Sequence, residues 1–132
     1  MHKGSAIWLS FPLTPLLGCA ENDVLCAPLA NWAVAVDVRD SATNSLLSSQ
    51  ARGAVFLAGV LDDSLRPDLL FHLSSDTLLV GGITEGRVEV RVQYPGYQPW
   101  VARDVQTRLD RSGDCADWVT QRLVARLQAE PD

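Results

Sequence analysis

The chain has 132 residues, of which 47% are hydrophobic and 20% are charged, and its formal net charge at pH 7 is −5. This size and composition are typical of one globular domain and exclude a disordered chain. The acidic balance and the lack of any run of Lys or Arg argue against a nucleic-acid partner, because phosphate binding requires a basic surface.

The first eighteen residues differ in composition from all that follow. His2 and Lys3 form a short basic start before an apolar run over residues 6–17, and none of the 16 acidic residues lies in this segment. This layout is typical of a secretory signal peptide, and the run is shorter than the roughly 20 residues that span a bilayer. We therefore expect residues 1–18 to be a cleaved signal peptide. The alternative is an uncleaved apolar strand of a cytosolic β-domain.

The segment "LLGC" at residues 16–19 resembles the bacterial lipobox, in which an aliphatic and a small residue precede the acceptor cysteine. The resemblance implies cleavage after Gly18 and acylation of Cys19, so that lipid holds the protein on a membrane. Ala20 follows the cysteine, and by analogy with the bacterial sorting rule the absence of Asp there favours the outer membrane. The segment thus predicts a lipid-anchored protein of the bacterial cell envelope, with residues 19–30 as its lipidated N-terminus and tether.

Cys26 and Cys115 are the cysteines that keep a thiol once Cys19 is acylated. In an exported protein an even pair predicts a disulfide, which over a loop of this length would stabilise the fold by about 4–5 kcal/mol on the chain-entropy model. The mature chain has a single histidine, His72, and no CxxC spacing, so the sequence argues against a zinc site.

Beyond the tether the dominant hydrophobic period is two, over the expected domain 31–132. Residues 32–39 alternate as a half-buried strand does, and a turn follows in which Asn44 tolerates the left-handed conformation. Residues 51–61 read as a second apolar strand. The charged segment 62–68, with its proline, then predicts a loop.

The loop expected at 62–68 offers carboxylate oxygens that a hard cation accepts. The spacing of Asp62, Asp63 and Asp68 matches no calcium loop with a turn glycine, and the chain has no Gly-rich phosphate loop. We therefore expect a solvated loop, with Arg66 paired to a carboxylate, and neither a metal nor a cofactor.

The second half of the chain continues the period-two pattern. Residues 68–73 and 76–83 are short strand candidates, 86–94 alternate cleanly and 100–109 form a further strand. The last segment, 117–128, also fits an amphipathic helix, although strand is preferred. About seven strands at this spacing predict an all-β, antiparallel-dominated sandwich. The alternation over 86–94 turns three valines inward and turns outward Arg87, Glu89, Arg91 and Gln93.

Three short motifs resemble the carboxypeptidase regulatory-like group of transthyretin-type (prealbumin-like) β-sandwiches. The resemblance covers most of residues 32–128 and implies a Greek-key sandwich, but it describes a fold and not a chemistry. It also implies that the first strand lies parallel to a late strand, with Cys26 and Cys115 at one end of the sandwich. The matching residues are Asp40, Thr43 and Leu47 in the first turn, with Asn44 in place of Gly; Glu85, Gly86, Val90 and Val92, with Val88 in place of an aromatic residue; and Gly96 with Tyr97.

The residues that two enzyme groups on related sandwiches require are missing from this sequence. The chain ends in "AEPD" where the 5-hydroxyisourate hydrolases end in Tyr-Arg-Gly-Ser, and the intradiol dioxygenases hold iron with two histidines. A small exported hydrolase that uses His72 is an alternative, but no Gly-x-Ser-x-Gly elbow supports it. We therefore expect no catalytic residues and a structural or binding role.

The segment "YPGYQPW" offers the best candidate for a binding surface. Tyr94, Tyr97 and Trp100 combine apolar area with a polar tip, which suits contact with a protein or a glycan. The competing interpretation is that Tyr97 and Trp100 cover an open end of the sandwich and that Tyr94 closes a hairpin.

Overall fold

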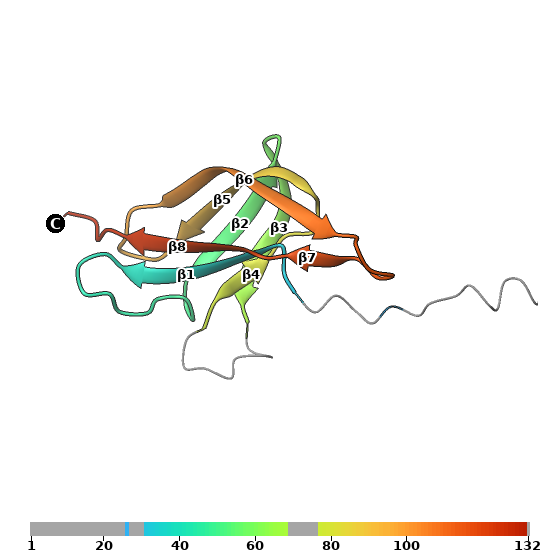
Figure 1. Ribbon diagram of the computed structural model, residues 1–132. Helices are drawn as coiled ribbons and strands as arrows, with labels where there is room; N and C mark the ends of the chain where they lie inside the picture. The colour runs from blue at the N-terminus through green and yellow to red at the C-terminus, as the bar shows by residue number, and fades with distance from the viewer. Residues whose placement is uncertain (1–25, 27–30, 69–76, 132) are drawn as a thin grey trace, which may run out of the picture.

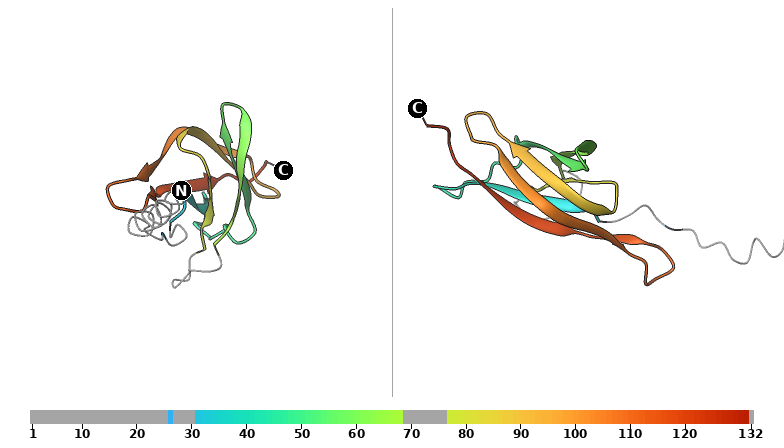
Figure 2. Two further views of the ribbon diagram at one scale, coloured as in Figure 1. Left: turned by 90° about the vertical axis from the view of Figure 1, so that its right-hand side faces the viewer. Right: turned by 90° about the horizontal axis from the view of Figure 1, so that it is seen from above.

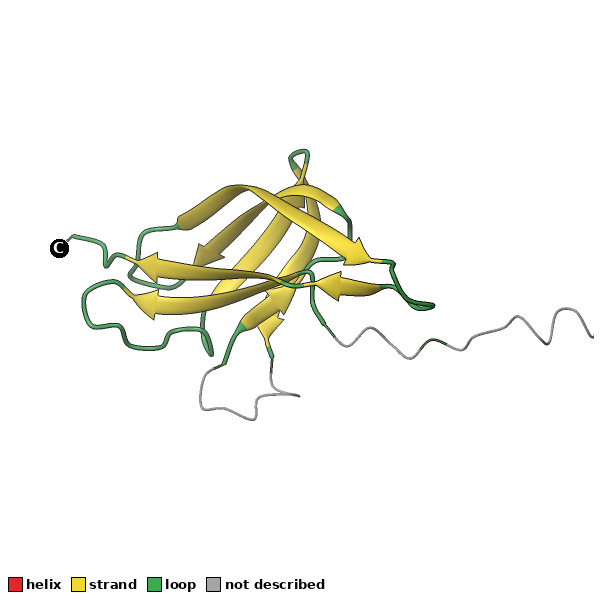
Figure 3. Cartoon of the chain, in the orientation of Figure 1, coloured by secondary structure: helices red, strands yellow, loops and turns green. Residues whose placement is uncertain are grey.

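A computed structural model describes residues 26, 31–68 and 77–131 of the chain. This described part contains eight strands and no helix, so it also contains no helix long and apolar enough to cross a membrane (Figure 3). The predicted all-β class is confirmed, with eight strands in place of about seven. In chain order (Figure 1) the strands are β1 (Val34–Asp40), β2 (Arg52–Leu57), β3 (Val60–Pro67), β4 (Leu79–Gly81), β5 (Gly86–Gln93), β6 (Trp100–Asp110), β7 (Asp117–Val119) and β8 (Gln121–Leu127).

The eight strands form one mixed sheet in the order β7-β6-β5-β2-β3-β4-β1-β8. Within the described residues β1 and β8 run parallel, with Val34 opposite Gln121, and every other pair of neighbours is antiparallel. The predicted dominance of antiparallel pairing is therefore confirmed. The parallel pairing of the first strand with a late strand, which the resemblance implied, is present as well.

The two ends of this strand order approach each other, so that the sheet nearly closes into a barrel (Figure 2). Only Thr120 separates β7 from β8, so the chain passes directly from one end of the order to the other. At the opposite end of β8 an isolated bridge joins Tyr97 to Ala129, and the Gln98 amide donates to the Gln128 carbonyl at 2.8 Å. The sheet thus has one continuous inner face.

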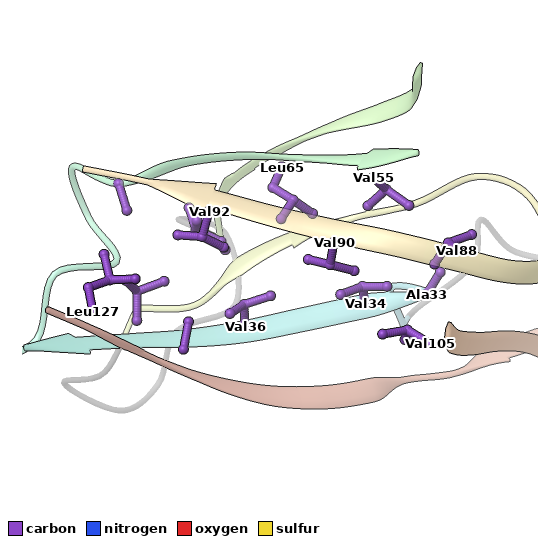
Figure 4. Packing of buried hydrophobic residues seen from close by; sticks show 14 of the residues in the cluster. Ala33, Val34, Val36, Val55, Leu65, Val88, Val90, Val92, Val105 and Leu127 are labelled. Carbon is purple, nitrogen blue, oxygen red and sulfur yellow. The ribbon is translucent and has the colours of Figure 1, made fainter. Parts of the chain in front are cut away.

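The core lies on this inner face and is built mainly from valines. In Figure 4 the valines of β5 face Val34 and Val36 of β1, and Val88, Val90 and Val92 are each at most 2% exposed. A valine side chain buried in this way stabilises the fold by about 1.5–3 kcal/mol. The inward and outward alternation predicted for residues 86–94 is confirmed.

The segment 51–68 differs from the prediction in two ways. It is a hairpin, because the chain reverses at Ala58 and Gly59, whose φ angles of 51° and 80° are typical of a two-residue turn. The segment predicted to be a loop is mostly strand β3, which pairs with both β2 and β4. The acidic residues suit a strand here because their carboxylates find backbone donors in place of water.

Of the remaining strand predictions, one is confirmed, one corresponds to a shorter strand, and one lies mostly outside the described residues. The preference for strand over helix at 117–128 is confirmed, although the segment is divided at Thr120 into β7 and β8. Of the candidate at 76–83, the structure describes residues 77–83, and within these Leu79–Gly81 is strand. Most of the candidate at 68–73 lies outside the described residues.

Candidate functional site

The turn after β1 and the connection between β5 and β6 meet at Asp40. Its carboxylate accepts hydrogen bonds from the amides of Ala42 (2.7 Å) and Thr43 (2.9 Å) and from the Tyr97 hydroxyl (2.5 Å). Asn44 has a φ of 63°, which is the left-handed conformation that favours Gly. Two of the three motifs in the resemblance, Asp40 with Asn44 and the Tyr97 segment, are therefore joined directly.

The hydrogen bond between Tyr97 and Asp40 also shifts the acidity of both groups. It is the largest cause that lowers the pKa of Asp40, and the Ala42 and Thr43 amides lower it further. The same bond is the largest cause that raises the pKa of Tyr97. Asp40 therefore stays ionised and Tyr97 protonated over a wide pH range, which suits a structural contact.

The three aromatic residues predicted as a binding surface are half-buried and pack against the core cluster. The Tyr94 and Tyr97 rings meet edge to face, with centroids 5.3 Å apart, and the Tyr94 hydroxyl donates to Gln50 Oε1 at 3.4 Å. Trp100 begins β6 opposite the buried Val92. Packing accounts for much of their apolar area, and their use as a binding surface stays a prediction.

A disulfide joins Cys26 to Cys115, whose Cα atoms are 5.6 Å apart. Cys26 lies ahead of β1, and Cys115 lies in the connection between β6 and β7. A hydrogen bond holds the same two segments together beside the disulfide, because the Asn31 side chain donates to Asp117 Oδ2 at 3.1 Å. The chain is thus fixed to the β6–β7 connection before its first strand begins.

Three other predicted features lie outside the described residues. They are the signal peptide at 1–18, the acylation site Cys19, and His72, the base of the alternative hydrolase. All three stay predictions.

The acidic side chains of β3 bind the segment that follows β4. Asp63 Oδ2 accepts from the Gly82 amide at 2.8 Å, while Asp62 accepts from the Ile83 amide at 3.0 Å and from the Thr84 hydroxyl at 2.5 Å. Arg66 lies 3.5 Å from Asp63, as the sequence predicts for an arginine beside these carboxylates. Within the described ranges no group of three His, Cys, Asp or Glu side chains is placed to hold a metal ion.

The outer face of β2, β5 and β6 gathers exposed arginines. The register sets Ala54 opposite Arg91 and Arg91 opposite Val101, so side chains of three strands become neighbours on this face. Arg91 stacks on the ring of Phe56, with its guanidinium carbon 4.2 Å from the ring centroid. We call this surface the arginine face and define it by Arg52, Phe56, Arg87, Glu89, Arg91 and Arg103.

One carboxylate of the arginine face is shared between two arginines. Glu89 Oε2 lies 2.5 Å from Arg91 Nε, and Glu89 Oε1 lies 3.3 Å from Arg103 Nε. Neither Arg52 nor Arg87 forms an ion pair with any carboxylate in the described part of the chain. The face therefore keeps cationic groups that are free to bind an anion.

Two shallow hollows lie side by side on the arginine face. One, of about 170 Å³, is lined by Arg52, Phe56, Arg91 and their neighbours on β2 and β5. The other, of about 290 Å³, lies toward the β2–β3 turn and includes Arg87 and Arg103, together with the acidic Glu89 and Asp104. Both hollows share Phe56 and Arg91, so this stacked pair stands between them.

The sequence predicts part of the arginine face. The alternation over 86–94 correctly predicts that Arg87 and Arg91 point outward, but it does not show which strands lie beside them. Arg52 and Arg103 join them only through the pairing of β2 and β6 with β5. Arginines that are scattered along the chain are therefore collected by the sheet register.

Comparison with known proteins assigns no family to the chain. No protein-family model matches the chain, and no curated protein matches it.

Proposed function

We propose that the chain is a lipid-anchored module of the bacterial cell envelope with a binding, non-catalytic role. The observation that carries this proposal is the Cys26–Cys115 disulfide, because such bonds persist in exported proteins and are rare in the cytosol. The signal layout of residues 1–18 supplies the route of export, and Cys19 supplies the anchor. Ala20 after the cysteine favours the outer membrane.

The fold of the module in this proposal is a Greek-key β-sandwich of the transthyretin type. In this proposal β7, β6, β5, β2 and β3 of the single sheet act as one layer, and β4, β1 and β8 act as the other. The parallel pairing of β1 with β8 supports this assignment. The hydrogen bond from Tyr97 to Asp40 supports it further, because it joins two of the motifs that carry the resemblance.

The arginine face supports binding over catalysis. Guanidinium groups stay protonated at all physiological pH values, so they hold anions but do not exchange protons with a substrate. A protein or a glycan is the expected partner, and a nucleic acid is not, since the chain as a whole carries a net charge of −5.

The experiment that tests the proposal is mass spectrometry of the protein purified from its native membrane. We expect an N-terminus at an acylated Cys19 and no free thiol, because Cys26 and Cys115 are bonded. Cys19→Ser is the matched variant, and we expect it to leave the membrane fraction with its disulfide intact. A full-length, unacylated chain with three free thiols in the cytosol would overturn the proposal.

The alternative hydrolase is tested at His72. In a strain that lacks the chromosomal copy, we expect His72→Ala to restore every phenotype that the wild-type copy restores. Failure of this variant to complement, with its protein level and disulfide unchanged, would favour the enzyme.

A further inference from the structure

We infer that the arginine face binds an acidic polysaccharide whose charged groups are carboxylates. The inference deepens the proposed function and depends on it for its biological setting, since an exported, anchored protein meets such polymers. The binding itself depends only on the residues of the arginine face.

Charge complementarity is the first argument. The face bears Arg52, Arg87, Arg91 and Arg103 against two acidic residues, Glu89 and Asp104, in a chain whose formal net charge is −5. A cationic surface on an acidic protein attracts anions locally while the rest of the molecule repels them. The ligand must therefore be anionic, and it must contact this face.

The type of anion follows from Glu89. Its two carboxylate oxygens lie between the guanidinium groups of Arg91 and Arg103, so this face already accommodates one planar carboxylate. Planar carboxylates match the forked donors of arginine and accept paired hydrogen bonds from them. Arg52 and Arg87 offer the same donors at the outer parts of the face.

The shape of the face indicates a chain of repeating units. Ligand pockets that enclose a whole small molecule measure roughly 300–1,000 Å³. The hollows of about 170 and 290 Å³ are smaller, they are open, and the Phe56–Arg91 stack divides them. Each hollow has at least two arginines, so consecutive acidic sugars of one chain would each meet a cationic group.

An acidic peptide fits this face less well. Extended peptides bind to sheets mainly by adding a strand to a free backbone edge. Strand β2 lies between β3 and β5, and β5 lies between β2 and β6, so their backbone groups are already paired. Over β2 and β5, which carry Arg52, Arg87 and Arg91, the face therefore presents side chains only, whereas β6 pairs with β7 only over Arg108–Asp110 and has no second partner strand elsewhere among the described residues.

A lipid surface fits it less well too. Proteins that lie on a bilayer insert apolar side chains between the headgroups. Of the five large hydrophobic residues exposed in the described chain, two adjoin the face, Leu61 opposite Phe56 and Val101 opposite Arg91. The other three lie at the start of β3, after β4 and on β8, so no continuous apolar patch covers the face. A flat bilayer also leaves the two hollows unfilled.

The test is calorimetric titration of the full protein, purified as the cell makes it, with a hexamer of galacturonic acid. We expect saturable binding that weakens as salt rises, and no saturable binding of a neutral hexasaccharide. The double variant Arg52→Gln with Arg87→Gln should bind the hexamer at least tenfold more weakly.

The matched control is Arg122→Gln with Arg126→Gln, which removes the same charge from exposed positions on β8. This control should bind within twofold of the wild type. The arginine-face variant should keep the thermal midpoint of the wild type, and the control should melt slightly lower, because Arg126 donates to Asn44 Oδ1 at 3.0 Å. Equal weakening by the two double variants would overturn the inference, because attraction would then depend on net charge alone.

Two further ligands separate the alternatives. Hexaglutamate that binds as tightly as the uronate hexamer would assign the face to acidic peptides, and anionic phospholipid vesicles that bind more tightly would assign it to membranes; either result overturns the inference. The N-terminal mass is measured independently of these titrations. Failure of the inference and failure of the proposed function are therefore distinguishable.

Discussion

The carboxylates of β1 and β3 and the arginines of the outer face differ in what they contact. Asp40, Asp62 and Asp63 each accept hydrogen bonds from backbone amides of loops, so their charge holds the fold together. Arg52 and Arg87 bond to no carboxylate of the described chain and project from the sheet. The carboxylates and the arginines contribute equally in magnitude to the net charge. Only the arginines are available to a ligand, because the carboxylates are already hydrogen-bonded within the fold.

Glu85 shows the same use of an acid in another loop. It forms an ion pair with Arg111 and accepts from the Leu109 amide at 3.0 Å, which ties the β4–β5 connection to the end of β6. The hydrogen bond from Arg111 is the largest cause that lowers the pKa of Glu85, and the Leu109 amide adds to it. Glu85 therefore links segments that lie 24 and 26 positions apart in the sequence.

The largest effect is expected where an acid is removed from a strand. Asp62→Ala leaves the Ile83 amide and the Thr84 hydroxyl without their acceptor, and we expect it to lower the free energy of unfolding by about 1–3 kcal/mol. Urea unfolding measures this loss. The control is Glu130→Ala, whose exposed side chain should matter by less than about 0.5 kcal/mol; equal losses in the two variants would break the comparison.

The next effect concerns pH. The pKa values of Asp40 and Glu85 are lowered in the folded state, so the stabilisation they give is complete above the unfolded values near pH 4 and is lost as pH falls through the lower folded values. Tyr97→Phe removes the largest cause of the shift at Asp40. We expect the difference in melting temperature between wild type and this variant to be greatest at pH 6 and to shrink below pH 4. A difference that is constant from pH 6 to pH 2 would contradict this account.

The smallest effect is expected on the arginine face. Arg52→Ala with Arg87→Ala should change the free energy of unfolding by less than about 0.5 kcal/mol, since neither side chain has a carboxylate partner in the described residues. Urea unfolding beside Asp62→Ala gives the comparison directly. A loss of more than 1 kcal/mol would mean that these arginines are structural.

The regular parts of the fold were predictable because their signal is local. In residues 86–94 each valine alternates with a polar side chain, and this pattern alone places Val88, Val90 and Val92 inside. Strand β3 was missed because Asp62 and Asp63 resemble solvated loop residues. Their partners lie some twenty positions later in the chain, and no local pattern reveals them.

The candidate site was predictable only in part, for the same physical reason. Alternation turns Arg87 and Arg91 outward, whereas Arg52 and Arg103 become their neighbours through pairing between strands. Tyr97 and Trp100 have the side chains of a binding surface in sequence, yet in the fold both pack against the core. Register decides which exposed groups share a surface.

If Cys19 carries the proposed lipid, the position of Cys26 sets how far the domain can stand from the membrane. Cys26 follows Cys19 by seven positions, so with Cys19 acylated the fully extended leash measures about 25 Å. If the disulfide were reduced, the leash would run on to Asn31, which still donates to Asp117, twelve positions from Cys19, and its reach would be about 40 Å. In the proposed setting, one covalent bond would thereby shorten the reach of the arginine face above the membrane from about 40 Å to about 25 Å.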